Sequence, residues 1–385
     1  MPVEDRFAAI RPYHDHEVPR VIAALLDNRE FIHAITRLRF AWLPESIVGW
    51  LRPVVSCVLR RQARRIRSVA DFQKIVERYM SLMIDSTVTD LTVSGLENLS
   101  PDCAYLFIGN HRDIALDAAF VNYALFHHGQ GTVRIAIGDN LLTRDYVSDL
   151  MRLNKSFVVG RSARGPRQQF AVYRELSEYI HHSIVNEHHS IWIAQREGRA
   201  KDGWDRTEPA IIKMLSIAKP KELSLAEHIR ALRVVPVVIS YEWDPCDIAK
   251  AHELCLRAST GNYAKGEQED VSSIARSITS RKGTIHVAFG SALQDEFATP
   301  EAVAEEIDRQ ILGMYRMHPS NIVAYRLLHG VLPPGFEDAV GMPETEAELE
   351  RRLASMPEAE RPFLLTMYAN PLVNRDAPPA PAETA

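Results

Sequence analysis

The amino-acid sequence predicts an α/β protein in which a mixed sheet is flanked by helices and preceded by a helical segment. From Leu91 onward, short apolar runs typical of buried strands alternate with longer stretches of helical periodicity. Before this point, apolar residues recur at helical spacing over about 19–88. The 385 residues allow one large domain with smaller additions. We expect a helical segment over 1–90, a main domain over 91–335, and a C-terminal helix with a disordered Pro/Ala-rich tail over 336–385.

Within the helical segment, the stretch 40–67 has the composition of an interfacial helix. Trp42 and Trp50 stand among aliphatic residues, and the arginines of 52–67 have no acidic residue among them. In such a helix, aromatic rings lie at headgroup depth and arginines bind anionic phosphates. The alternative is a helix that packs its apolar face on the main domain and leaves a basic face in solvent. We expect peripheral contact with an anionic membrane.

The chain is expected in the cytoplasm, at the inner face of the cell membrane. The N-terminus, 1–6, is charged and lacks the apolar core of a secretion signal. No apolar run approaches the roughly 20 residues of a membrane-spanning helix. The formal net charge of −5 argues against a protein that coats nucleic acid. The cysteines lack metal-ligand spacing and are expected to be reduced and structural; they are Cys57, Cys103, Cys246 and Cys255.

The elements of the main domain follow in order along the chain. Each predicted strand is an apolar run bounded by polar or turn residues, and helical periodicity separates several of them. The predicted strands are Ala104–Ile108, Val133–Ile137, Ser156–Val159, Ser190–Ala194, Val234–Ser240 and Thr284–Phe289. The predicted helices are Arg167–Val185, Glu208–Ile217 and, after the last strand, the amphipathic helical segment Thr299–Leu332.

A histidine and two carboxylates follow the first of these strands: His111, Asp113 and Asp117. A strand that ends in Gly-Asn delivers such side chains to a loop, where functional groups concentrate. An imidazole beside a carboxylate can take a proton from a hydroxyl, because the carboxylate fixes the tautomer and stabilises the imidazolium. We interpret this group as the equipment for acyl transfer to an alcohol. A solvated surface pair is the alternative.

Later strands open into further candidate binding residues. Arg161 and Arg164 follow the third strand in a loop of small residues and suit bidentate phosphate binding. Pro236 lies in the fifth strand and is expected to form a pocket wall. Since ligands bind at the carboxyl ends of strands in open α/β sheets, a base beside several cations describes a hydroxyl acceptor that carries phosphate. The loop after the fourth strand adds Glu197, Gly198, Arg199 and Lys201.

In this combination, the sequence resembles the glycerolipid acyltransferase family, which includes the glycerol-3-phosphate and 1-acylglycerol-3-phosphate acyltransferases. The family's blocks are His-x4-Asp, an arginine block, Glu-Gly-x-Arg and a proline-bearing strand. They occur here in that order at His111, Arg161, 197–201 and Pro236. The stretches 161–165, 237–242 and 282–290 are similar to the glycerol-3-phosphate branch. The resemblance covers about 91–293.

Two spacings depart from the family pattern. His111 to Asp117 is His-x5-Asp, one residue longer than usual, and 197–199 is Glu-Gly-Arg, one residue shorter than Glu-Gly-x-Arg. Both changes fall in loops, where a changed length is tolerated better than in a strand. Asp117 is the favoured partner of His111 because 116–120 resembles the residues that follow the family's aspartate. Asp113 is the other candidate.

The resemblance implies a glycerol-3-phosphate acyltransferase-like fold and an O-acyltransferase of phospholipid biosynthesis. Such an enzyme moves a fatty acyl group from acyl-CoA or acyl-ACP to a hydroxyl of glycerol-3-phosphate or lysophosphatidate. His111 would be the base, Arg161, Arg199 and Lys201 would hold the acceptor phosphate, and Glu197 would position the acceptor. Acyl carrier protein is a candidate partner, and no metal or cofactor besides the thioester is expected. The alternatives are a catalytically weak phospholipid-binding protein and a thioester hydrolase.

Overall fold

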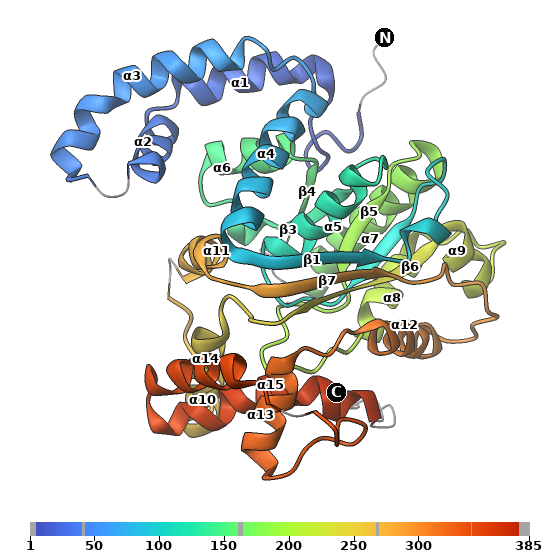
Figure 1. Cartoon of the computed structure of the whole chain (residues 1–385). Coiled ribbons are helices and arrows are strands. Elements are labelled where there is room, and N and C mark those ends of the chain that lie inside the picture. The colour runs from blue at the N-terminus through green and yellow to red at the C-terminus, as the bar shows by residue number, and fades with distance from the viewer. Residues whose placement is uncertain (1–4, 41–42, 161–164, 267–268, 340, 377–385) are drawn as a thin grey trace. The chain divides into compact units, whose positions relative to one another are not determined.

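The computed structural model describes residues 5–40, 43–160, 165–266, 269–339 and 341–376 (Figure 1). Their contacts divide the chain into two units. The first unit comprises the residues up to Ser81 together with Arg134–Val172, and the second comprises Leu82–Val133 together with the residues from Tyr173 onward. In the described part of the chain, no helix has the length and apolarity needed to cross a membrane.

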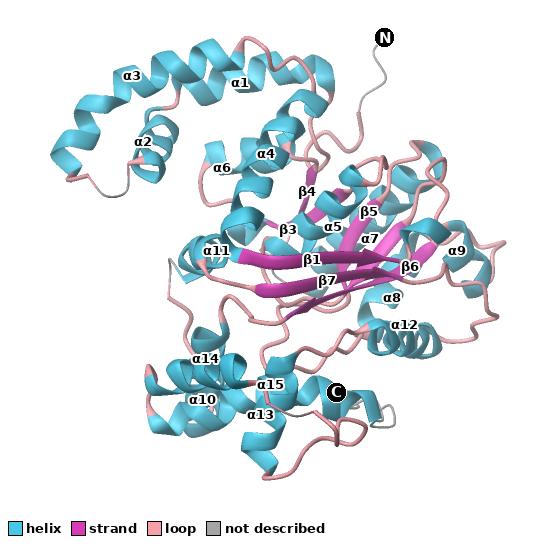
Figure 2. Ribbon diagram, in the orientation of Figure 1, coloured by secondary structure: helices cyan, strands magenta, loops and turns pink. Residues whose placement is uncertain are grey.

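The second unit is built on a mixed sheet, which confirms the predicted fold class (Figure 2). Its strands lie in the order β1-β7-β6-β2-β5, and β6 and β7 are antiparallel while the other neighbours are parallel. All residues of β2 and β6 are buried, as expected for central strands covered on both faces. The strands are β1 (Val88–Ser94), β2 (Leu106–Gly109), β5 (Ile191–Ala194), β6 (Val234–Tyr241) and β7 (Gly283–Phe289).

Helices pack on this sheet and at its end. Phe120 of α5 lies edge-on to Tyr241 of β6, and α12 packs against β6 and α8. A separate apolar cluster, which includes Trp243, Leu364 and Tyr368, joins α10, α13, α14 and α15. The helices of this unit are α5 (Leu116–His127), α8 (Pro209–Leu215), α9 (Leu225–Ala231), α10 (Asp247–Thr260), α11 (Glu269–Thr279), α12 (Pro300–Met314), α13 (Pro319–His329), α14 (Pro343–Ala354) and α15 (Arg361–Asp376).

The first unit contains the predicted N-terminal helices and a parallel strand pair. Its core is an apolar cluster that includes Val21, Leu25 and Phe31 from the first two helices and Leu153 from α6. Asn28 caps α2 by accepting a hydrogen bond from the Phe31 N–H at 3.0 Å. The elements are α1 (Val18–Asp27), α2 (Arg29–Arg39), α3 (Glu45–Ala63), β3 (Arg134–Gly138), α6 (Asp145–Leu153) and β4 (Ser156–Val159); α4 (Val69–Thr87) and α7 (Pro166–His181) lead from this unit into the second.

The structure adds elements that the sequence pattern did not predict. β1 begins where the predicted helical segment ends, and its partly exposed residues lack the apolar run that identified the other strands. The predicted helical segment Thr299–Leu332 is divided into α12 and α13, since Pro319 starts a new helix. Two helices, α14 and α15, occupy the C-terminal part where one was expected. The predicted disordered tail, which starts at Ala377, lies outside the described residues. Trp42 of the predicted interfacial helix also lies outside them.

Gly95, directly after β1, lies against Phe289 at the end of β7. Its φ of +84° is left-handed, and a Cβ there would lie 1.9 Å from the carbonyl oxygen of Phe289. We expect Gly95→Ala to lower the free energy of unfolding by about 3 kcal/mol or more, because the cost of a strained φ and the cost of the steric clash are added together. Gly129→Ala is the matched control, with a φ of +73° but open space, and should cost about 1 kcal/mol. Urea unfolding of both variants measures the difference, and equal losses would contradict the clash.

Candidate active site

The loop after β2 is anchored at its first residue. Asn110 is buried, and its side-chain amide both donates to and accepts from the backbone of β6. Its Nδ2 donates to the carbonyl of Ile239 at 3.0 Å, and its Oδ1 accepts from the Ile239 N–H at 2.8 Å. The amide therefore acts as a strand partner beyond the end of β2 and fixes where the next residue, His111, leaves the sheet.

His111 is paired with Asp117 and not with Asp113. The imidazole Nδ1 lies 3.0 Å from Asp117 Oδ2, and the Asp117 side chain is 1% exposed while that of His111 is 16% exposed. An ionised carboxylate can only accept, so Nδ1 carries the hydrogen and the neutral ring presents a lone pair at Nε2. No described residue hydrogen bonds to Nε2. The pair thus has the arrangement of a base with its orienting carboxylate.

Three further donors hold the Asp117 carboxylate. Oδ2 also accepts the backbone N–H groups of Arg112 at 2.7 Å and Asp113 at 2.8 Å. Oδ1 accepts the hydroxyl of Tyr241, the last residue of β6, at 2.9 Å. The longer His-x5-Asp spacing is accommodated because the loop turns two N–H groups back onto the carboxylate in the first turn of α5. The role of Tyr241 was missed from the sequence, since 124 residues separate it from Asp117.

Asp113 has a different partner set. Its Oδ1 accepts the N–H groups of Ala115 at 2.9 Å and Leu116 at 2.8 Å, which caps the start of α5. Its Oδ2 accepts the hydroxyl of Ser277 in α11. Burial, together with the neighbouring charge of Asp117, raises the pKa of Asp113. Asp113 therefore organises the helix start rather than the imidazole.

Arg112, which lies between His111 and Asp113 in the chain, is held through its guanidinium and its carbonyl. Its guanidinium makes two hydrogen bonds to Asp205, at 3.0 and 2.6 Å, and a third to the carbonyl of Gly203 at 3.1 Å. Its own carbonyl accepts from Lys250 of α10 at 2.6 Å, and Lys250 is paired with Asp244. These buried hydrogen bonds of the guanidinium fix the loop that carries His111. No sequence pattern marked Asp205 or Lys250, because the contact joins segments 93 and 138 residues away from Arg112.

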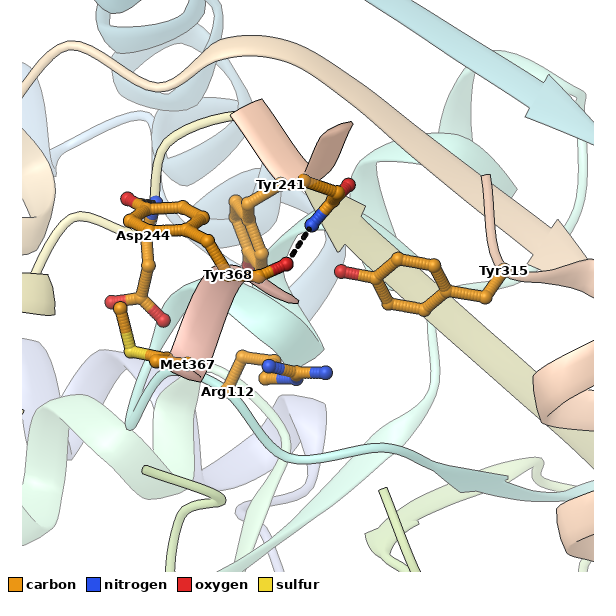
Figure 3. Close-up of a pocket in the computed structure, with 7 residues that line it drawn as sticks. Arg112, Tyr241, Asp244, Tyr315, Met367 and Tyr368 are labelled. Atoms are coloured by element: carbon orange, nitrogen blue, oxygen red, sulfur yellow. Dashed lines mark hydrogen bonds between the residues drawn. The ribbon is translucent and has the colours of Figure 1, made fainter. Parts of the chain in front are cut away.

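A small cavity lies beside the side chain of Arg112 (Figure 3). It has about 10 Å³ of space for the centre of a water molecule, which is room for about one water and too little for an acyl chain or a glycerolipid. Burial raises the pKa of Tyr315 at its edge to about 12, so this hydroxyl stays protonated. We assign the cavity to packing behind the loop and not to substrate. Its lining residues are Arg112, Tyr241, Asp244, Tyr315, Asn321, Met367 and Tyr368.

The loop after β5 is joined to the histidine loop. The N–H of Ala200 donates to the carbonyl of His111 at 2.7 Å, and Gly198 allows the turn with a φ of +75°. Nη1 of Arg199 is buried and has no hydrogen-bond partner among the described residues. Glu197 is exposed. The structure thus brings the predicted Glu-Gly-Arg block beside His111.

The charge of Lys201 is already paired. Its Nζ lies 2.5 Å from Oε1 of Glu253 in α10, and Arg257 contacts the same oxygen at 2.7 Å. Burial lowers the pKa of Lys201. Among the candidate cations of this loop, Arg199 is therefore better placed than Lys201 to receive a new anion.

The remaining predicted binding residues are Arg161, Arg164 and Pro236. Arg161 and Arg164 are outside the described residues. Pro236 is buried inside β6, opposite Ile108 of β2, and its carbonyl accepts from the Gly290 N–H at 2.8 Å. Because side chains alternate along a strand, Pro236 and Tyr241 point to opposite faces of the sheet. Across the described ranges, no group of three His, Cys, Asp or Glu side chains is placed to hold a metal ion.

The comparison with protein families relates the segment that carries this site to a known family. Residues 90–240 match the model of the acyltransferase family, and this segment contains His111, Asp117 and the loop 197–201. Over this segment, the chain is similar to the acyltransferase family.

A solved structure is also similar to the chain. It is the crystal structure of PlsC, the 1-acyl-sn-glycerophosphate acyltransferase from Thermotoga maritima. The two chains are 14% identical with a TM-score of 0.38, and the match covers 76% of this chain and 91% of that chain. A search of curated proteins finds no significant match. The similarity of residues 90–240 to the acyltransferase family rests on the family model.

The hydroxyl of Tyr241 offers a direct test of the geometry around Asp117. We expect Tyr241→Phe to lower the free energy of unfolding by about 2 kcal/mol, because a buried carboxylate loses a charge-assisted hydrogen bond while the ring against Phe120 is kept. Tyr315→Phe is the matched control, since the Tyr315 hydroxyl hydrogen bonds to no described residue. Urea unfolding at neutral pH measures both. Similar losses in the two variants would contradict the assigned hydrogen bond.

Proposed function

We propose that this protein transfers a fatty acyl group from an acyl-CoA or acyl-ACP thioester to a hydroxyl of glycerol-3-phosphate or lysophosphatidate. The observation that carries the proposal is the His111–Asp117 pair, which lies inside the acyltransferase-family segment and has an unbonded Nε2. An imidazole in this state suits removal of a proton from an alcohol near neutral pH.

The reaction follows from the pair's geometry. Nε2 of His111 takes the hydroxyl proton as the alcohol oxygen attacks the thioester carbonyl carbon. Asp117 keeps the ring oriented and stabilises the imidazolium. When the tetrahedral intermediate collapses, the thiolate leaves and takes the proton from Nε2, so the products are an ester and a free thiol. No described serine or cysteine hydrogen bonds to His111, which favours direct attack over an acyl-enzyme.

The acceptor phosphate is assigned to Arg199, Arg161 and Arg164. Arg199 supports this because Nη1 is buried without a partner, and the backbone of the next residue is bonded to His111. A guanidinium suits phosphate because it offers paired donors in a plane. Arg161 and Arg164 remain in the proposal through the family resemblance. Lys201 and Glu197 are assigned to positioning the acceptor, with the Lys201 charge shared with Glu253.

The first unit is assigned to peripheral contact with an anionic membrane at the inner face of the cell membrane. Apolar residues at helical spacing are exposed along one side of α3, and Trp50 is 85% exposed. This is the pattern of a helix that lies in the headgroup region. The exposed apolar side chains are Ile47, Trp50, Val54 and Val58. Arg61, Arg64, Arg65 and Arg67, also exposed, follow at the end of the helix and just beyond it.

The proposal is tested by acyl transfer with two donors and two acceptors. Radiolabelled palmitoyl-CoA and palmitoyl-ACP are each offered glycerol-3-phosphate or lysophosphatidate. Labelled lysophosphatidate from glycerol-3-phosphate identifies the first acylation, and labelled phosphatidate from lysophosphatidate alone identifies the second. Loss of the thioester without an acceptor identifies a hydrolase. Phospholipid binding without turnover in any arm would overturn the transferase proposal in favour of a binding protein.

Substitution of the paired residues distinguishes their roles. We expect His111→Ala to lower kcat by about 1,000-fold or more because the general base is lost, with the fold intact by circular dichroism. Asp117→Ala should cost far more activity than Asp113→Ala, because Asp117 holds the ring while Asp113 caps α5. Steady-state kinetics of the three variants provides the measurement. The reverse ranking of the two aspartates would reassign the orienting carboxylate.

Membrane contact is tested with vesicles. We expect Arg64→Gln with Arg65→Gln to weaken binding to phosphatidylglycerol vesicles by about 30-fold, since each arginine near an anionic surface is worth about 1 kcal/mol. Trp50→Ala should also weaken binding, whereas Val331→Ala, an exposed apolar control in the second unit, should not. Vesicle cosedimentation measures all three. Equal binding to phosphatidylcholine and phosphatidylglycerol vesicles would contradict the proposed electrostatic attraction between these arginines and an anionic membrane.

A further inference from the structure

The indole of Trp192 contains a buried hydrogen-bond donor that no described residue uses. Trp192 lies in β5 and is 4% exposed, and its Nε1–H has no acceptor among the described residues. A buried tryptophan N–H normally finds a partner, because leaving a donor unpaired away from water costs stability. The donor is therefore not committed to any of the described residues and is available to another acceptor.

The position of this donor depends on a glycine. β5 runs parallel to β2 with Trp192 opposite Phe107 and Ala194 opposite Gly109, so the indole lies on the face that also carries Gly109. A Cβ on Gly109 would lie 2.6 Å from Nε1. The absent side chain allows the N–H edge of the indole to lie over the carboxyl end of β2, two residues before His111.

The indole is also next to the imidazole. The two rings are edge-on, with centroids 6.1 Å apart and an interplanar angle of 70°. Nδ1 of His111 is committed to Asp117, so the acceptor alcohol must approach the other ring nitrogen. A thioester carbonyl attacked by that alcohol has to lie in the same region, within reach of the groups that border the imidazole.

We infer that Trp192 is a catalytic residue whose Nε1–H donates a hydrogen bond to the carbonyl oxygen of the acyl thioester. The inference rests on the proposed acyl transfer. As the alcohol oxygen bonds to the carbonyl carbon and its proton moves to His111 Nε2, the carbonyl π electrons move onto oxygen. The oxyanion accepts from Trp192. When the C–O double bond re-forms, the C–S bond breaks and the thiolate leaves with the proton from Nε2.

The effect of such a donor falls on the rate and not on binding. A neutral thioester oxygen is a weak acceptor, whereas the oxyanion is a strong one, so the hydrogen bond strengthens toward the transition state. A donor fixed by strand packing needs no reorganisation during the reaction. Three other side chains just after β5, Gln195, Arg196 and Arg199, also have a buried donor without a hydrogen-bond partner among the described residues. The charge of Arg199 suits the acceptor phosphate better than a neutral N–H would.

The test removes the N–H while keeping the ring. Trp192→Phe keeps an aromatic side chain, and replacement of Trp192 by 3-benzothienylalanine keeps the indole shape with sulfur in place of N–H. We expect both to lower kcat by about 100-fold, the typical effect of removing one oxyanion donor, with KM within about threefold. The pH dependence of kcat should be unchanged because His111 and Asp117 are intact. Trp243→Phe, in the apolar cluster of α10, α13 and α15, is the control and should keep kcat.

The outcomes separate this inference from the proposed function. If the wild-type protein shows His111-dependent transfer and the benzothienyl variant keeps wild-type kcat, the donor role is overturned while the transferase proposal stands. The same conclusion follows if kcat falls only in Trp192→Phe, since ring shape would then be the cause. If the wild-type protein transfers no acyl group, the proposed function fails first. The isosteric variant keeps the test decisive even when Trp192→Phe unfolds.

Discussion

The carboxylate of Asp117 is the point on which the site depends. It is almost completely buried, and a buried charge is tolerated only when donors surround it. Its four donors come from the imidazole of His111, two backbone N–H groups of the same loop and the hydroxyl of Tyr241 in β6. One group therefore fixes the tautomer of the base, the path of the loop and the distance between the loop and the central strand. The geometry of the base follows from satisfying this charge.

A second group of buried charged residues fixes the loop that carries His111. Arg112 is fixed by Asp205 and, through its carbonyl, by Lys250 of α10. Asp247 in the same helix is paired with Arg352 of α14 and accepts the hydroxyl of Tyr368 of α15. Removing one partner of a buried pair typically costs about 3–5 kcal/mol, because the other charge is left uncompensated. The C-terminal helices thus support the active loop as well as their own apolar cluster.

Arg199 and Trp192, two of the residues near His111 with an unpaired donor, have complementary chemistry. Arg199 offers a charged, planar group on a loop, whereas Trp192 offers a neutral N–H fixed by strand packing. A phosphate is charged in the ground state and is best held by a cation, while a thioester oxygen acquires its charge only during the reaction. In the proposed reaction, the same strand and its loop therefore supply one group for each substrate.

The sequence by itself determined the order of the strands and loops that carry the chemistry. Strand-length apolar runs and the His-Asp and Glu-Gly-Arg blocks are contiguous, so local periodicity and spacing were sufficient to find β2, β5, β6 and His111. It favoured Asp117 over Asp113 only through the family resemblance, because both lie within reach in the chain and the path of the loop decides between them. It did not find β1, whose exposed residues lack an apolar run.

Only the tertiary structure decided which distant residues complete the site. Tyr241 meets Asp117 because the sheet places β6 beside β2, and Asp205 meets Arg112 because the loop after β5 turns back at Gly203. Lys201 was a candidate for phosphate binding from its position, yet α10 brings Glu253 to it. Local patterns record what a segment can form, whereas partners are chosen by strand order and burial, which depend on the whole chain.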